Sequence, residues 1–109
     1  MATRIVLIRH APTDSHGRLC GSFDLPLSPA GQVQLSALLG RPPKQAAPDV
    51  LMTSTLCRAR EVAAALGRAW ALEPHAAEWA REIHCGDVEG MPLHQLQHEF
   101  VGLWTRNEA

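Results

Sequence analysis

A cation and an imidazole directly follow a short apolar run near the N-terminus. Residues 5–8 read Ile-Val-Leu-Ile, and Arg9 and His10 come next. A neutral imidazole is a nucleophile near neutral pH. An arginine offers a planar fork of N–H donors that matches the oxygens of a phosphate or carboxylate group. This pair of residues could therefore bind an anion and also attack it.

A second arginine stands in a comparable position later in the chain. Arg58 falls in the first turn of a predicted helix that follows Ser54 and another short apolar run. A helix N-terminus offers free backbone N–H groups and the positive end of the helix dipole, and both favour an anion. Because ligands of open α/β sheets bind beyond the carboxyl ends of the strands, Arg9, His10 and Arg58 predict a phosphate pocket.

The strands that must position these side chains are short. The continuous, β-branched run at residues 5–8 is typical of a strand covered on both faces in a parallel sheet. A second strand is predicted within residues 49–54, and a weaker pattern indicates a third within residues 71–83. The residues from Ala11 to Pro26 are rich in turn formers and predict a loop.

Three helices alternate with these strands. The first is predicted over residues 27–40, with Ser28 as its N-cap and Gly40 at its end. The second covers residues 55–70 with Ser54 as the cap, and the third covers residues 91–104. Alternating strands and helices indicate an α/β fold. The length of 109 residues favours a single domain over residues 1–109.

The composition indicates which partners and which cellular compartment are favoured. Eleven acidic and ten basic residues give a net charge of −1, which does not favour nucleic acid or an anionic membrane surface as a partner. No apolar stretch approaches the roughly 20 residues of a membrane-spanning helix, and no signal peptide is recognised. The three cysteines are odd in number and far apart, which favours a reducing compartment and hence the cytoplasm.

Four motifs together resemble those of a known family. The segments IRHAPT, GRLCGSFDLPLSPAGQVQ, TSTLCRAREVA and AREIHCGDVEG are similar, in order and spacing, to motifs of the histidine phosphatase (phosphoglycerate mutase-like) superfamily. Within it they look most like its small phosphatases of the alpha-ribazole phosphatase type. The resemblance runs from Arg4 to about Gly90. It implies a three-layer α/β/α fold and hydrolysis of a small phosphomonoester through a phosphohistidine.

The resemblance also implies roles for individual residues. His10 would be the nucleophile, and Glu82 would be the acid that protonates the leaving oxygen. The phosphate oxygens would be bound by Arg9, Arg58, Thr13 and His16. Phosphoryl transfer mainly requires positioning and compensation of negative charge, which arginines supply, so we expect no metal and no cofactor. His75, His84 and Cys85 lack the spacing of metal ligands.

Two departures from the family pattern stand out. Ala11 occupies the place where the family has glycine, which adds one methyl group near the pocket. The family also has a second histidine in a His-Gly motif on a later strand, whereas His94 and His98 here are not followed by glycine. The chain thus looks like the N-terminal part of such a domain. We expect an unpaired sheet edge that invites association with a second copy.

Two other functions stay open at this point. One is a phosphoglycerate-type mutase, which would retain the phosphoryl group and which is less consistent with a compact chain. The other is a non-catalytic phosphate-binding or assembly module, consistent with the missing second histidine. The substrate is expected to be a small phosphorylated metabolite, and the sequence does not indicate which one.

Overall fold

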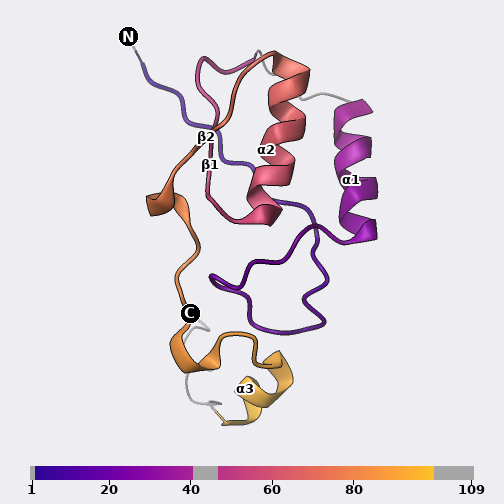
Figure 1. Cartoon of the computed structure of the whole chain (residues 1–109), viewed down its shortest axis with the longest axis vertical. Helices are drawn as coiled ribbons and strands as arrows, with labels where there is room; N and C mark the ends of the chain where they lie inside the picture. Colours follow the sequence, from indigo (N-terminus) through magenta and orange to yellow (C-terminus); the bar gives the residue numbers. More distant parts are fainter. Residues whose placement is uncertain (1, 41–46, 100–109) are drawn as a thin grey trace.

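The computed structural model describes residues 2–40 and 47–99. Three helices and two strands follow one another along the chain (Figure 1). Their order and bounds are α1 (Pro29–Gly40), β1 (Met52–Thr53), α2 (Cys57–Trp70), β2 (His75–Ala76) and α3 (Leu93–Glu99). Two 3₁₀ turns, at Glu78–Ala80 and Gly86–Val88, lie between β2 and α3.

The two strands form a parallel sheet. Met52 lies opposite His75, and Thr53 lies opposite Ala76. The N–H of His75 donates to the carbonyl oxygen of Leu51 at 2.9 Å, and that of Ala77 donates to Thr53 at 2.8 Å. Because α2 connects the two strands, they form a β–α–β unit. The predicted α/β class is confirmed, although both strands are shorter than their predicted ranges.

The predicted strand at residues 5–8 is wrong for this structure. No described residue pairs with this segment, and the sheet contains only β1 and β2 in the ranges described. Ile5 and Leu7 are 80% and 92% exposed. A strand requires a neighbour whose N–H and C=O groups complete the ladder, and an apolar pattern alone does not supply one. The segment is therefore apolar but uncovered within the described part of the chain.

The core lies between α1 and α2, which run side by side in Figure 1. Its buried side chains belong to Leu27, Leu35, Val62, Ala65 and Leu66. Burial of apolar side chains from both helices holds them together, and α2 also packs against β1. The position of α2 in the centre matters, because its first turn carries Arg58.

The two long helices begin in different ways. Ser28 caps α1 as predicted, since its Oγ accepts the N–H of Gly31 at 3.0 Å. The predicted cap of α2 by Ser54 is wrong, because the N-cap is Leu56, which has no capping side chain. Instead, the carboxylate of Asp24 accepts the N–H of Cys57 at 2.6 Å. A carboxylate there also suits the positive end of the helix dipole.

The third predicted helix is confirmed over Leu93–Glu99; Met91 and Pro92 precede it without being helical, and residues 100–104 of its predicted range lie outside the described residues. Backbone bonds join its start to the loop after the nucleophile candidate. Leu93 N–H donates to the carbonyl of Gly17 at 2.7 Å, and Leu19 N–H donates to Met91 at 2.8 Å. None of the helices within the described ranges has the length and apolar character needed to cross a membrane.

Candidate active site

Four of the six predicted site residues line one open cavity of about 520 Å³. These four are Arg9, His10, Thr13 and Arg58. The rest of the wall comes from Ala11, Pro12, Ser15, Arg18, Cys20 and Gln34. Three arginines and a histidine therefore face the cavity, while none of its lining residues is acidic. Such a wall attracts an anion.

The imidazole of His10 is oriented by its neighbour. Nδ1 lies 2.7 Å from the carbonyl oxygen of Ala11. A carbonyl oxygen only accepts hydrogen bonds, so this contact assigns the proton to Nδ1. The lone pair of Nε2 is then free. This is the tautomer that an imidazole needs in order to attack phosphorus.

The start of α1 fixes the segment that carries His10. The backbone N–H and the Oγ of Ser28 both donate to the carbonyl oxygen of Pro12, at 2.9 and 3.2 Å. Gly31 packs so closely against this carbonyl that a Cβ would clash with it. Thr13 forms an antiparallel bridge with Leu27. The nucleophile candidate thus sits on a backbone anchored to a helix rather than on a free loop.

Arg58 is 5% exposed and held by backbone carbonyls of a second loop. Its Nη2 donates to Gly21 at 2.7 Å and to Cys20 at 3.4 Å, and its Nη1 donates to Phe23 at 3.0 Å. A buried guanidinium is stable only when its donors find acceptors, and here the loop supplies them. Residues 20–23, which contain these three acceptors, are called the clamp loop below.

Arg18 lines the same cavity and was not predicted as a site residue. Its Nε donates to the carbonyl of Ser15 at 3.0 Å, and its guanidinium carbon lies 5.3 Å from the centre of the Phe23 ring. These contacts fix a third cation near His10. The signal in the sequence was a basic residue within the glycine-containing loop that follows the nucleophile candidate.

Glu89 was also missed, and it binds the clamp loop from the other side. Its carboxylate accepts the N–H groups of Ser22 at 2.7 Å, Cys85 at 3.1 Å, and both Gly21 and Phe23 at 3.3 Å. Burial raises the pKa of Glu89, but these backbone bonds outweigh it, and the pKa lies below its usual value. The carboxylate is therefore charged at neutral pH.

The structure does not bring Glu82 and His16 into the cavity. Glu82 is exposed on the segment that follows the first 3₁₀ turn. His16 is exposed in a turn, where its φ is 52°, and it is not among the lining residues. Their roles stay predictions based on the resemblance. The same holds for the catalytic and binding roles of the four residues that do line the cavity.

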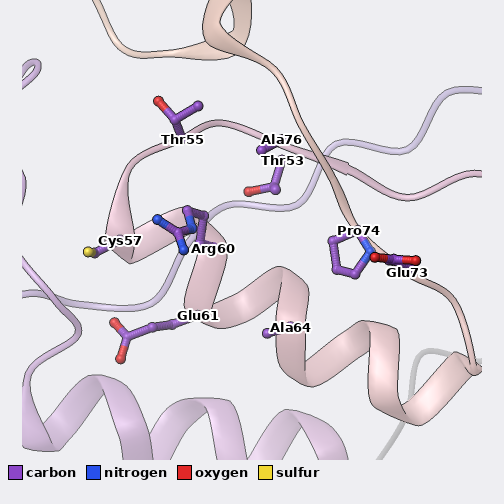
Figure 2. A pocket seen from close by; sticks show the side chains of 9 residues that line it. All are labelled: Thr53, Thr55, Cys57, Arg60, Glu61, Ala64, Glu73, Pro74 and Ala76. Atoms are coloured by element: carbon purple, nitrogen blue, oxygen red, sulfur yellow. The ribbon is translucent and has the colours of Figure 1, made fainter.

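A second cavity of about 560 Å³ lies beside α2 (Figure 2). Thr53, Thr55, Cys57, Arg60, Glu61, Ala64, Glu73, Pro74 and Ala76 line it. Burial and the charge of Asp24 raise the pKa of the Cys57 thiol, so it is not a thiolate at neutral pH. Over the described residues, no group of three or more metal-ligating side chains is arranged around a common point. Of these two cavities, the one beside His10 is lined by the predicted nucleophile and by three arginines, whereas the second has Arg60 and two glutamates in its wall.

Comparison with known protein families finds a match over nearly the whole chain. The model of the histidine phosphatase superfamily (branch 1) matches residues 5–109. Glucosyl-3-phosphoglycerate phosphatase of Mycobacterium tuberculosis is 33% identical over an alignment of 106 residues that covers 93% of this chain and 46% of that protein. The chain thus spans about half the length of the curated relatives that it matches.

Solved structures agree on the fold. The mycobacterial glucosyl-3-phosphoglycerate phosphatase in complex with inorganic phosphate has a TM-score of 0.76 at 30% identity, covering 89% of this chain and 45% of that one. A candidate alpha-ribazole-5′-phosphate phosphatase from Escherichia coli has a TM-score of 0.73 at 24% identity, covering 90% and 50%, and this likeness shows the fold alone. The motifs, the fold and the family match agree, and the chain belongs to the histidine phosphatase superfamily, branch 1.

Proposed function

We propose that this chain carries the reacting half of a phosphatase that hydrolyses a small phosphomonoester through a phosphohistidine at His10. One observation carries the proposal. Nδ1 of the imidazole lies 2.7 Å from the carbonyl oxygen of Ala11, an arrangement that favours Nε2 as the attacking nitrogen, and the imidazole lines a cavity that three arginines and no carboxylate share. Positioned cations and a free nucleophile are what phosphoryl transfer requires.

The chemistry proceeds in two steps. Nε2 of His10 attacks phosphorus, the ester P–O bond breaks, and the alcohol leaves after taking a proton. Water then attacks phosphorus and gives a proton to the group that had protonated the alcohol; the P–N bond breaks with its electron pair returning to Nε2, and inorganic phosphate leaves. Arg9 and Arg58 would bind the phosphoryl oxygens and offset the charge on them in both steps.

The predicted proton donor does not line the cavity that holds His10. The resemblance assigns this role to Glu82, which is exposed and outside the cavity lining. To act as the acid, its carboxyl group must come within hydrogen-bonding reach of the leaving oxygen. This role therefore requires the segment around Glu82 to approach His10 when substrate is bound.

The class of substrate follows from the wall of the cavity and from the relatives. The mycobacterial relative takes its name from glucosyl-3-phosphoglycerate, and its structure has been determined with inorganic phosphate. Both facts support a small phosphorylated metabolite as the substrate of this chain. Arg9 and Arg58 would bind the phosphate group, and Arg18 adds a third cation to the cavity wall. A substrate with a second anionic group therefore suits this cavity best.

A non-catalytic phosphate-binding module is the second candidate. The exposed position of Glu82 favours it, because a site without an acid can bind phosphate but releases an alcohol slowly. The two candidates differ in turnover rather than in phosphate binding.

Hydrolysis of p-nitrophenyl phosphate distinguishes the phosphatase from the non-catalytic module. Phosphate binding is measured by calorimetry on the same samples. We expect turnover in the wild type and in a His75→Ala control, whose imidazole is exposed on β2, and none in His10→Ala. Phosphate binding without turnover in the wild type would support the non-catalytic module instead. Absence of both binding and turnover in the wild type would contradict the proposed function.

A further inference from the structure

The clamp loop is bound from both faces of its backbone by two opposite charges. Arg58 donates to the carbonyl oxygens of Cys20, Gly21 and Phe23. Glu89 accepts the N–H groups of Gly21, Ser22 and Phe23. Each residue of the loop thus bonds to at least one of the two side chains. Bonds to charged partners are about twice as strong as neutral ones.

The clamp loop in turn determines where the cavity wall lies. Cys20 is part of that wall, and the ring of Phe23 supports the guanidinium of Arg18, which is also part of it. Phe23 therefore connects both charged side chains to Arg18, through its backbone on one side and its ring on the other. A shift of the loop would move Cys20 and Arg18 together.

Glu89 also joins a second segment to this loop. Its carboxylate accepts the N–H of Cys85 at 3.1 Å, three residues after Glu82. Gly21 makes the approach possible, because a Cβ there would clash with the carbonyl oxygen of Ile83 and with the carboxylate of Glu89. The predicted acid thus lies on a segment that the same carboxylate ties to the cavity wall.

We propose that Glu89 is a positioning residue of the phosphate cavity, acting through the backbone of the clamp loop as the counterpart of Arg58. Glu89 does not line the cavity itself. Its backbone and hydroxyl partners among the described residues are donors, namely the N–H groups of residues 21, 22, 23 and 85 and the hydroxyl of Ser22. A carboxylate, which only accepts, is matched to such a set, whereas an amide would place its own donors against them. This inference rests on the proposed function of the cavity as a phosphate site.

The test compares Glu89→Gln and Glu89→Asp with a matched control, Glu78→Gln. Glu78 is an exposed glutamate whose carboxylate pairs only with the exposed Arg81 among the described residues, at 3.4 Å. Two quantities are measured on the full chain: hydrogen exchange of the amides of residues 21–23, and the dissociation constant for inorganic phosphate.

In Glu89→Gln we expect the exchange of these amides to accelerate about tenfold or more, which corresponds to the loss of one hydrogen bond. We expect phosphate to bind about ten- to a hundredfold more weakly, the range that the loss of supporting bonds costs at other binding sites. Glu89→Asp keeps an acceptor-only carboxylate on a shorter side chain, so both effects should be smaller. Glu78→Gln should change neither quantity.

The results of these measurements distinguish the positioning role of Glu89 from the proposed function of the cavity. Unchanged exchange at residues 21–23 in Glu89→Gln overturns the positioning role, and so does faster exchange with an unchanged affinity for phosphate. If Glu89→Gln does not fold, Glu89→Asp decides by the same two quantities. A wild type that binds no phosphate overturns the proposed function and this inference together, and the wild-type measurement alone reveals that case.

Discussion

At the scale of single residues, backbone groups orient the side chains proposed to react. His10 is oriented by the carbonyl of Ala11, and Arg58 by carbonyls of the clamp loop. The planar guanidinium of Arg58 matters for its shape as well as its charge, because its N–H donors point in several directions and reach several carbonyl oxygens at once.

Arg58→Lys tests the contribution of that shape. A lysine keeps the charge but cannot donate to Gly21 and Phe23 with the same geometry, so buried carbonyls lose partners. We expect a loss of about 1–3 kcal/mol in the free energy of unfolding, together with weaker phosphate binding. Urea denaturation and calorimetry measure the two effects. Arg60→Lys, at an exposed position on α2, is the control, and equal behaviour of both variants would contradict the account.

Glu89 predicts a dependence of stability on pH. Its pKa is lowered in the folded chain relative to the ordinary value of 4.5. A lowered pKa means that the folded state holds the proton less tightly, so the stabilisation is complete above the ordinary pKa and declines as the pH falls through the folded one. The difference in urea midpoint between wild type and Glu89→Gln should therefore shrink from about pH 6 to about pH 3.5. A constant difference would contradict the role of the charge.

At the scale of elements, the sequence predicted those helix caps and helices that are determined by residues close together in the chain. Ser28 lies three residues before the N–H that it caps, and the strand–helix alternation that predicts α2 is local as well. The cap of α2 by Asp24 could not be predicted in this way, because the two partners lie 33 residues apart. The same holds for Glu61, whose carboxylate accepts the N–H of Leu27 at 2.6 Å.

The predicted strand at residues 5–8 failed for a related reason. Its apolar residues indicate that the segment would be stable when buried. Strand pairing also needs a neighbouring strand, and no local sequence pattern identifies that neighbour. Glu89 was missed because most of its partners are backbone N–H groups far away in the sequence, and backbone groups are the same at every position. Arg18 was missed because one of its partners is a backbone carbonyl, that of Ser15. The candidate site was thus predicted where side-chain chemistry is distinctive, at Arg9, His10 and Arg58.

Gly21→Ala tests how closely the clamp loop and the segment around Glu89 pack. A methyl group there would clash with the carbonyl of Ile83 and with Glu89, so one of the two segments must move. We expect a loss of about 1–3 kcal/mol in stability and weaker phosphate binding. Gly40→Ala is the control, because no atom of the described residues lies within 4 Å of the added Cβ at the end of α1. Thermal denaturation should leave Gly40→Ala unchanged or slightly more stable.

Equal stability of Gly21→Ala and wild type would contradict the close packing. It would also weaken the case that one carboxylate connects the two segments.

At the scale of the whole molecule, apolar side chains that suit a covered position remain exposed. Ile5 and Leu7 expose most of their surface, and Val6, Ile8 and Met52 of β1 are about half exposed. Exposed apolar residues next to a two-stranded sheet favour association with further chain, because burial removes their surface from water. We therefore predict that purified chains self-associate through this segment.

Sedimentation velocity tests the association, with Leu7→Lys as the variant and Val33→Lys as the control. Val33 is 70% exposed on α1, away from the N-terminal segment in sequence. Leu7→Lys should reduce the sedimentation coefficient to that of a monomer, while Val33→Lys should sediment as the wild type does. A wild type that remains monomeric at all concentrations, with a cooperative unfolding transition, would contradict the prediction.

The central claim is that His10 takes the phosphoryl group, and trapping this intermediate tests it most directly. The chain is mixed with p-nitrophenyl phosphate and quenched in alkali, in which phosphohistidine survives, and the modified peptide is identified by mass. We predict one added phosphoryl group on the peptide that contains His10, and none in His10→Ala. Turnover without any adduct, or an adduct that persists in His10→Ala, would contradict the account.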